Sequence, residues 1–201
     1  MFGEFDAHAI GSTVLQGEKV RFRELQDRDL PDLVRWWRNP EMALFQNLTV
    51  TPQPENAVVE MYRGWSTNTK PGNVGFSVVD RETDVLVGHV TLYGASLPTR
   101  AATLAVLIGA DHVDRGYGTD AVRLLTDFGF MELGLHRIEL RVFDYNERAR
   151  AVYRKLGYTE EGTRRAVAFH HGEFHDEVIM AVLAGQWFTC PTGAHGPSAC
   201  G

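Results

Sequence analysis

The sequence predicts an α/β fold with a single mixed, mostly antiparallel central sheet flanked by helices. Segments with the two-residue periodicity of strands alternate with segments of helical periodicity, in the order β–α–α–β–β–β–α–β–α–β–β. No segment repeats, and no linker divides the chain before residue 189. A hydrophobic fraction of 44% over 201 residues is enough to build one sizeable core. These observations together indicate one domain in which helices pack on a sheet.

The first half of the chain contains one strand, two helices and a hairpin. The predicted elements are, in order, a strand at 19–25, helices at 28–39 and 51–65, and strands at 74–80 and 85–94. Asp27 is the expected N-cap of the first helix, and the Asn39-Pro40 pair ends it. The second helix begins after two prolines, which favour helix starts.

The second half alternates more regularly. It contains a strand at 102–109, a helix at 119–133, a strand at 136–143, a helix at 146–157 and two strands within 158–188. The first of these strands is the most apolar run and the expected centre of the sheet. Gly134 and Gly157 follow the two helices at the position where glycine commonly ends a helix. The last two strands meet in a turn at His171-Gly172.

Charge and hydropathy bound the function. The formal net charge of −6 favours a cationic substrate such as an amine over nucleic acid, whose binding surfaces are usually basic. The N-terminus has no basic start followed by an apolar core, so we expect no signal peptide. No apolar run approaches the ~20 residues that span a bilayer, so we expect no membrane association. The expected location is the cytoplasm.

The domain is expected at 19–188, between an N-terminal extension at 1–18 and a disordered tail at 189–201. The tail holds the chain's two cysteines, Cys190 and Cys200, with His195 between them. A structural zinc site usually has four ligands in close pairs, so the tail predicts free thiols and no metal. The histidines of the last hairpin, at 170, 171 and 175, are interpreted as a solvated turn for a similar reason.

A glycine-containing loop carries the clearest functional signal. Residues 113–118, VDRGYG, lie between the most apolar strand and a helix. Free backbone N–H groups and the positive end of the helix dipole make such a loop a natural anion site. Gly116 and Gly118 let a ligand approach the backbone, but a plain turn into the helix would also use glycine. The loop lacks both the dinucleotide fingerprint GxGxxG and the Gly-Lys-Ser/Thr of a P-loop.

The next helix adds an amide and a phenol. Asn146 stands at its start, and Tyr153 follows seven residues later on nearly the same face. Taken singly, Asn146 is explained as an N-cap and Tyr153 as a core aromatic. Together with the neighbouring loop they predict a site for a long phosphorylated ligand.

With these features the sequence resembles the GNAT superfamily of acetyl-CoA-dependent N-acetyltransferases over roughly residues 19–188. The specific parts are AVLIGADHVDRGYGTDAV and the later N-x6-Y followed by RKLGY. The ending HHGEFHDEVIMAVLAGQWF is similar to the branch that acetylates ribosomal-protein N-termini, which also contains enzymes for small amines. The resemblance implies the GNAT-like acyl-CoA N-acyltransferase fold and acetyl-CoA as co-substrate. It is also compatible with a homodimer, which no feature of this sequence requires.

The resemblance assigns roles to residues of the strand, the loop and the later helix. In this family the apolar strand splays from the strand after the glycine-loop helix, and its free backbone groups pair with the pantetheine arm. The residues implied for that arm are Val106, Leu107 and Ile108. Those implied for the pyrophosphate are Val113, Asp114, Arg115, Gly116, Tyr117 and Gly118, with Thr119 behind them. Asn146 would contact the cofactor beyond the loop, and Tyr153 would protonate the departing thiolate. A phenol with a pKa near ~10 can donate to a thiolate whose thiol has a pKa near ~8.5.

Two positions depart from the family pattern. Val113 stands where the family often has Gln or Arg, although Arg115 still offers charge to a phosphate. Thr103 stands where many relatives carry a glutamate as general base, and threonine is not a base at neutral pH. Either another side chain or a water chain must therefore take the amine proton, or the substrate amine enters partly neutral.

Three side chains are candidates for the missing base. Glu139 lies on the strand after the glycine-loop helix, where an ion pair with Arg137 or Arg141 is the alternative interpretation. His89, on the preceding hairpin, has a suitable unperturbed pKa near ~6.5, and Glu41 lies near the acceptor side.

The expected reaction is direct transfer of an acetyl group from acetyl-CoA to a primary amine, of a protein N-terminus or a small molecule. Positioning in a ternary complex supplies much of the rate. Aromatic residues of the first two helices and of the segment between them would shape the acceptor pocket unless they only fill the core; they are Trp36, Trp37, Phe45, Tyr62 and Trp65. A non-catalytic acyl-CoA-binding sensor or scaffold, and a transferase of a longer acyl group, are the alternatives.

Overall fold

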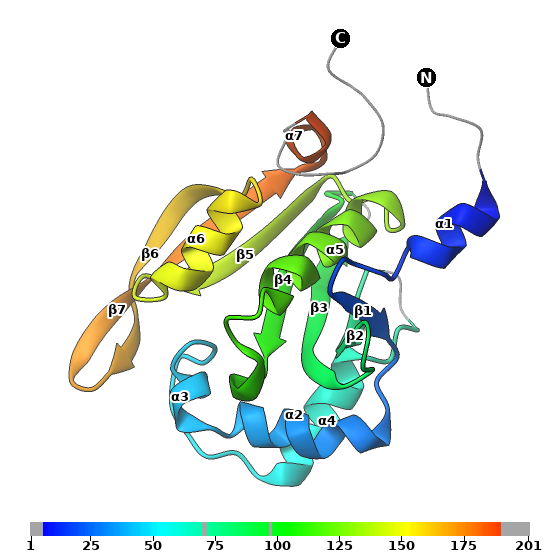
Figure 1. The fold of residues 1–201 in the computed structure, drawn as a ribbon. Helices are drawn as coiled ribbons and strands as arrows, with labels where there is room; N and C mark the ends of the chain where they lie inside the picture. The colour runs from blue at the N-terminus through cyan, green and yellow to red at the C-terminus, as the bar shows by residue number, and fades with distance from the viewer. Residues whose placement is uncertain (1–5, 70–71, 97, 190–201) are drawn as a thin grey trace.

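The computed structural model describes residues 6–69, 72–96 and 98–189 (Figure 1). Its α-helices are α1 (Ala7–Thr13), α2 (Leu30–Trp37), α3 (Pro40–Ala43), α4 (Glu55–Trp65), α5 (Tyr117–Met131), α6 (Glu147–Lys155) and α7 (Ala184–Thr189). Its strands are β1 (Val20–Arg23), β2 (Val74–Asp80), β3 (Leu86–Ser96), β4 (Ala101–Ile108), β5 (Arg137–Phe143), β6 (Thr159–His170) and β7 (Glu173–Leu183). Two 3-10 turns, η1 (Asp27–Asp29) and η2 (Ala110–His112), precede α2 and the glycine loop.

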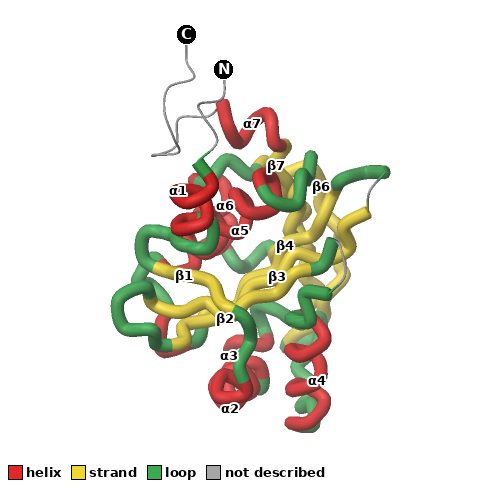
Figure 2. The backbone as a smooth tube through the Cα atoms, turned by 90° about the vertical axis from the view of Figure 1, so that its right-hand side faces the viewer, coloured by secondary structure: helices red, strands yellow, loops and turns green. Residues whose placement is uncertain are grey.

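The strands form one sheet in the order β1-β2-β3-β4-β5-β7-β6. Every neighbouring pair is antiparallel except β4 and β5, which are parallel. Helices α5 and α6 lie on one face, and α2 and α4 lie on the other (Figures 1 and 2). The predicted fold class, a mixed and mostly antiparallel sheet flanked by helices, is confirmed.

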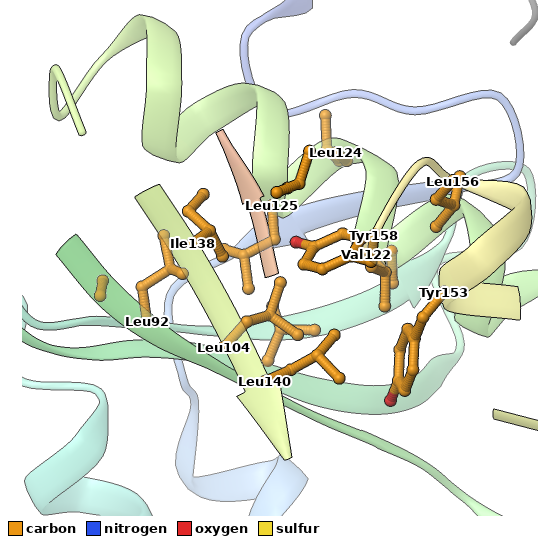
Figure 3. Packing of buried hydrophobic residues seen from close by; sticks show 14 of the residues in the cluster. Leu92, Leu104, Val122, Leu124, Leu125, Ile138, Leu140, Tyr153, Leu156 and Tyr158 are labelled. Atoms are coloured by element: carbon orange, nitrogen blue, oxygen red, sulfur yellow. The ribbon is translucent and has the colours of Figure 1, made fainter. Parts of the chain in front are cut away.

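The alternation of side chains along β4 divides the core into two parts. Leu104 belongs to the larger cluster, with Leu125 of α5 and Ile138 of β5 (Figure 3). Leu107 points to the opposite face and packs with Trp36 and other residues of α2 and α4. Because successive residues of a strand face opposite sides, one strand supplies apolar groups to both layers.

Most predicted elements are confirmed with small shifts at their ends. Strand β2 coincides with the prediction, and Gly134 and Gly157 have the expected positive φ of 61° and 92°. Asp27 is not the cap of α2, because η1 intervenes and the Asp27 carboxylate pairs with Arg63 at 3.1 Å.

The C-terminal end of the last predicted strand is wrong. Residues 184–189 form α7, which turns back so that Trp187 packs on Phe130 and Tyr158, with ring centroids 6.2 and 6.4 Å apart. The short helix α1, capped by Asp6, was not predicted. Cys190, His195 and Cys200 lie outside the described residues.

Asp120 fastens the start of the sheet to the start of α5. Its buried carboxylate accepts hydrogen bonds from the backbone N–H groups of Glu18, Lys19 and Val20 and from the Arg123 guanidinium. Burial alone would raise the pKa of Asp120, but the hydrogen bond from Lys19 and those from Arg123 and the other N–H groups outweigh it. The pKa is therefore below its usual value.

Replacing Asp120 with Asn should lower the free energy of unfolding at pH 7 by about 2–3 kcal/mol, because a buried charged acceptor of four donors is lost. A carboxylate whose pKa is lower in the folded state than in the unfolded state stabilises the fold at pH values above its unfolded-state pKa, here near 3.8. This stabilisation is lost as the pH falls through the folded-state pKa. In urea unfolding experiments, the difference in the free energy of unfolding between wild type and Asp120→Asn should therefore become smaller below about pH 4. Asp32→Asn, at an exposed carboxylate paired with Arg35, should cost less than about 0.5 kcal/mol and serves as control. Equal losses in both variants would contradict the anchoring role.

Candidate functional site

The sheet opens between β4 and β5. The two strands pair only where Ala101–Thr103 meets Arg137–Glu139. Beyond this point β4 continues along β3 alone and β5 along β7 alone, and the strands diverge toward α3 (Figure 1). In the described sheet, the backbone groups that β4 directs toward β5 after Thr103 have no ladder partner. An extended ligand with amide groups could pair with that free edge.

The diverging strands β4 and β5 form a V-shaped opening in the sheet, called the V below. The glycine loop joins the C-terminal end of β4 to α5, at the open end of the V. Asp114 and Gly116 both have left-handed backbones, with φ of 61° and 84°. Gly116 is the N-cap of α5 and brings no side chain to cap the helix, and intrahelical bonding begins with Asp120 N–H to the Gly116 carbonyl at 3.1 Å. The N–H groups of the first turn are therefore directed out of the helix end, as an anion site requires.

The two glycines of the loop differ in whether the fold itself requires glycine at their position. Gly116 is required by its backbone, since a positive φ is strained for other residues. A Cβ on Gly118 would make only an ordinary contact of 3.5 Å with Cγ1 of Ile108. The contacts of the fold alone therefore do not require glycine at 118.

Two contacts from distant segments hold the loop in place. Lys19 Nζ donates to the Arg115 carbonyl at 2.9 Å, and the Tyr117 hydroxyl donates to Asp80 Oδ2 at 2.5 Å. The bond from Tyr117, with further bonds from the turn after β2, lowers the pKa of Asp80 to about 2. Asp80 is therefore ionised at neutral pH and remains a strong acceptor.

The turn η2 is held against α2. Asp111 accepts from Arg35 Nη1 at 2.9 Å and from Trp36 Nε1 at 3.4 Å. A Cβ on Gly109 would lie 2.2 Å from the Trp36 ring, so only glycine fits there. The loop is thus shaped before any ligand binds, which lowers the entropic cost of binding.

Helix α6 begins on the other side of the V. Asn146 is its N-cap, and its side chain accepts from Ala149 N–H at 3.2 Å. Arg148, in the first turn, reaches across to the glycine loop and pairs with Asp114 at 2.9 Å. The structure therefore brings the start of α6 next to the loop.

Tyr153 lies two turns along α6. Its ring is buried 6.1 Å from that of Tyr158, and its hydroxyl has no hydrogen-bond partner among the described residues. Figure 3 shows that the hydroxyl points away from Tyr158 and Leu156. Burial raises the pKa of Tyr153 to about 12, so the phenol is protonated at neutral pH and able to donate.

Thr103 and Glu139 are register partners in the short parallel ladder, so both face the side of the sheet opposite α5. On that side Ala105 is exposed, since α2 and α4 cover the sheet only from Leu107 onward. Glu139 is partly exposed, and its carboxylate lies 3.3 Å from Arg137 and 3.9 Å from Arg141 on its own strand.

His89 is not available as a base. It is buried, its Nε2 lies 2.8 Å from Ser66 Oγ, and its ring packs 5.1 Å from that of Tyr62. Loss of hydration on burial lowers its pKa to about 3, so it stays neutral at physiological pH. Glu41 lies on α3, at the exposed end of the acceptor-side helices.

Four of the five aromatic residues expected in the acceptor pocket pack together under the sheet. Trp36 and Tyr62 are buried in the smaller core, and Trp37 and Trp65 pack edge-on against Tyr62. Phe45 differs, because it is half exposed and packs against a residue outside these helices.

That residue is Tyr145, the centre of a ring cluster that the sequence did not predict. Tyr145 follows β5, donates its hydroxyl to the Leu44 carbonyl, and packs 5.0 Å from His175 and 6.4 Å from His170. His170 is buried, so the interpretation of the hairpin histidines as a solvated turn is wrong for this one. The clustering of histidines in the hairpin was the available signal, but their contact with Tyr145 depends on the fold of the hairpin over the end of β5.

A family model described as the acetyltransferase (GNAT) domain matches residues 19–159. The chain belongs to the GNAT acetyltransferase family. It is an acetyl-CoA-dependent N-acetyltransferase, as its sequence predicted. Within the described residues, no helix combines the length and apolar character needed to cross a bilayer, and no three His, Cys, Asp or Glu side chains gather as metal ligands would.

Relatives of this chain within the GNAT family are named for different acceptors. The spermidine N(1)-acetyltransferase of Escherichia coli K12 is 25% identical over 90% of this chain and 89% of its own. The putative ribosomal N-acetyltransferase YdaF of Bacillus subtilis is 31% identical, over 51% of this chain and 56% of its own. The crystal structure of spermidine N-acetyltransferase from Vibrio cholerae with CoA and spermine has a TM-score of 0.76 at 23% identity, covering 85% of this chain and 99% of that one. The ribosomal branch is therefore one resemblance among several.

Proposed function

We propose that this GNAT enzyme transfers the acetyl group of acetyl-CoA to the primary amine of a protein N-terminus or a small molecule, by direct attack in a ternary complex. The observation that supports it most is the short ladder between β4 and β5, which ends at Thr103 and leaves a V with an anion-binding loop at its open end. A long ligand with amides in the middle and phosphates at one end fits this arrangement.

The chain's own residues would hold acetyl-CoA as follows. The free β4 edge at Val106, Leu107 and Ile108 pairs with the pantetheine amides. The loop from Val113 to Thr119 offers its backbone N–H groups to the pyrophosphate. Asn146 uses its carbonyl oxygen as the cap of α6, which leaves its amide nitrogen available to donate to the cofactor.

The chemistry then needs one electrophile, one acid and one base. The amine nitrogen attacks the thioester carbonyl, whose oxygen is polarised by a backbone N–H of the β4 edge. The carbon–sulfur bond breaks, and Tyr153 donates its proton to the departing thiolate. Glu139 accepts the proton that the amine loses, in place of a carboxylate at Thr103.

Acceptor choice is tested with purified full-length protein, acetyl-CoA and a panel of amines, by measuring CoA-thiol release. The panel contains peptides with free N-termini, spermidine and aromatic amines, since the exposed apolar residues Leu44 and Phe45 lie beside Tyr145. Turnover of at least one amine supports the proposal. Tight acetyl-CoA binding without turnover of any amine would favour the non-catalytic sensor, and faster transfer from longer acyl-CoA would correct the acyl group.

Replacing Tyr153 with Phe should lower kcat about 100-fold while changing the Kd for acetyl-CoA less than about threefold, because only the proton donor is removed. Steady-state kinetics and calorimetric titration separate the two effects. Tyr158→Phe is the matched control, since its hydroxyl bonds to Thr126 inside the core. Unchanged turnover in Tyr153→Phe would remove Tyr153 from the mechanism.

Replacing Glu139 with Gln should lower kcat at pH 7 by about 100-fold, and by less above pH 9, where more of the amine is already neutral. Glu161→Gln is the matched control, because Glu161 pairs with the same Arg137 at 2.5 Å but lies farther from Thr103 along the sheet. If the rate and its pH dependence are the same in wild type and Glu139→Gln, the base is another group or water.

A further inference from the structure

An ion pair closes the open end of the V. Asp114 Oδ1 on the glycine loop lies 2.9 Å from Arg148 Nη1 on α6. The two side chains are 75% and 62% exposed, and among the described residues each has only the other as a side-chain partner. The pair thus joins the two elements that follow the separated strands.

The carboxylate of Asp114 opposes the expected use of its own loop. The loop directs backbone N–H groups outward for an anion, while Asp114 adds a negative charge at the same place. A phosphate entering the loop would be repelled by that charge unless a cation remained nearby. Arg115 is one such cation on the loop itself, and Arg148 is the cation that pairs with Asp114 from across the V.

Several other cations near the loop or along α6 are paired elsewhere, while Arg115 lies exposed on the loop itself. Lys19 donates to the Arg115 carbonyl, and so supports the loop itself. Arg150 and Arg154, farther along α6, both pair with Glu160, at 3.0 and 2.7 Å. Among the α6 arginines, Arg148 is thus the one whose guanidinium reaches the loop.

We propose that Arg148 recognises a phosphate group of the CoA cofactor, and that it leaves Asp114 when the cofactor binds. This inference rests on the proposed position of the pyrophosphate in the glycine loop. Breaking an exposed ion pair costs little, whereas a guanidinium binds phosphate with two parallel charge-assisted hydrogen bonds. Because the guanidinium already touches a loop side chain, a change of rotamer is sufficient for the exchange.

The test measures the affinities of CoA, 3′-dephospho-CoA and pantetheine for wild type, Arg148→Ala, Asp114→Asn and Arg154→Ala, by calorimetry or by inhibition of turnover. Arg148→Ala should weaken CoA binding about tenfold and leave pantetheine binding unchanged. Asp114→Asn should strengthen CoA binding about threefold, because the competing carboxylate is gone. Arg154→Ala should match wild type, and thermal unfolding checks that every variant is folded.

The ligands show which phosphate is recognised. If Arg148→Ala loses affinity for CoA alone, Arg148 contacts the 3′-phosphate. If it loses affinity equally for CoA and 3′-dephospho-CoA, Arg148 contacts the pyrophosphate. Wild-type CoA affinity in Arg148→Ala, or an equal loss for pantetheine, overturns the assignment. Weaker CoA binding by Asp114→Asn overturns the exchange, because Asp114 would then be holding Arg148 in place. If wild type itself binds no CoA, the proposed function has failed; if wild type binds CoA and only these contrasts are missing, this inference alone has failed.

Discussion

The site depends on one restriction, that β4 and β5 pair over only three residues. Each of these strands has a full antiparallel ladder on its other side, β4 with β3 and β5 with β7. Sheet twist rotates successive strands, and two strands held by different partners can separate once their shared ladder ends. The cost is a row of unpaired backbone groups along β4. Such groups are normally satisfied, so an edge left open in the middle of a sheet is a place for a ligand.

The same separation fixes where the helices begin. The chain leaves β4 into the glycine loop and α5, and it leaves β5 into α6, so both helix N-termini stand at the open end of the V. Their dipoles direct partial positive charge to that end. The contacts of Lys19, Tyr117 and Asp111 with other segments keep the loop in this position.

The sequence predicted features that local patterns control. Strand β2 is bounded by turns on both sides, and the turn that follows α5 contains Gly134, whose left-handed φ is easy for glycine. The divergence of β4 from β5 came only from the resemblance, because the length of a parallel ladder depends on strands far apart in the chain. The tie from Lys19 to Arg115 spans 96 residues and has no local signal. His89 met the chemical requirement for a base, but the packing of Tyr62 over it removes it from solvent.

The replacement of the usual glutamate by Thr103 also bears on which amine suits this enzyme. Tyr93, Thr103 and Glu139 form one row across three strands, so the carboxylate lies one strand away from its usual place. Glu139 also contacts two arginines, which compete with an approaching ammonium group for the carboxylate. An amine that is already partly neutral when it binds depends least on a base to remove its proton. An α-amino group, with a pKa of about 7.7–8.0, is about one-tenth to one-sixth neutral at pH 7, whereas an alkylamine with a pKa of about 10.4 is neutral in about one molecule in 2,500. Under the proposed function, this difference favours a peptide or amino-acid α-amine over a polyamine as the acceptor.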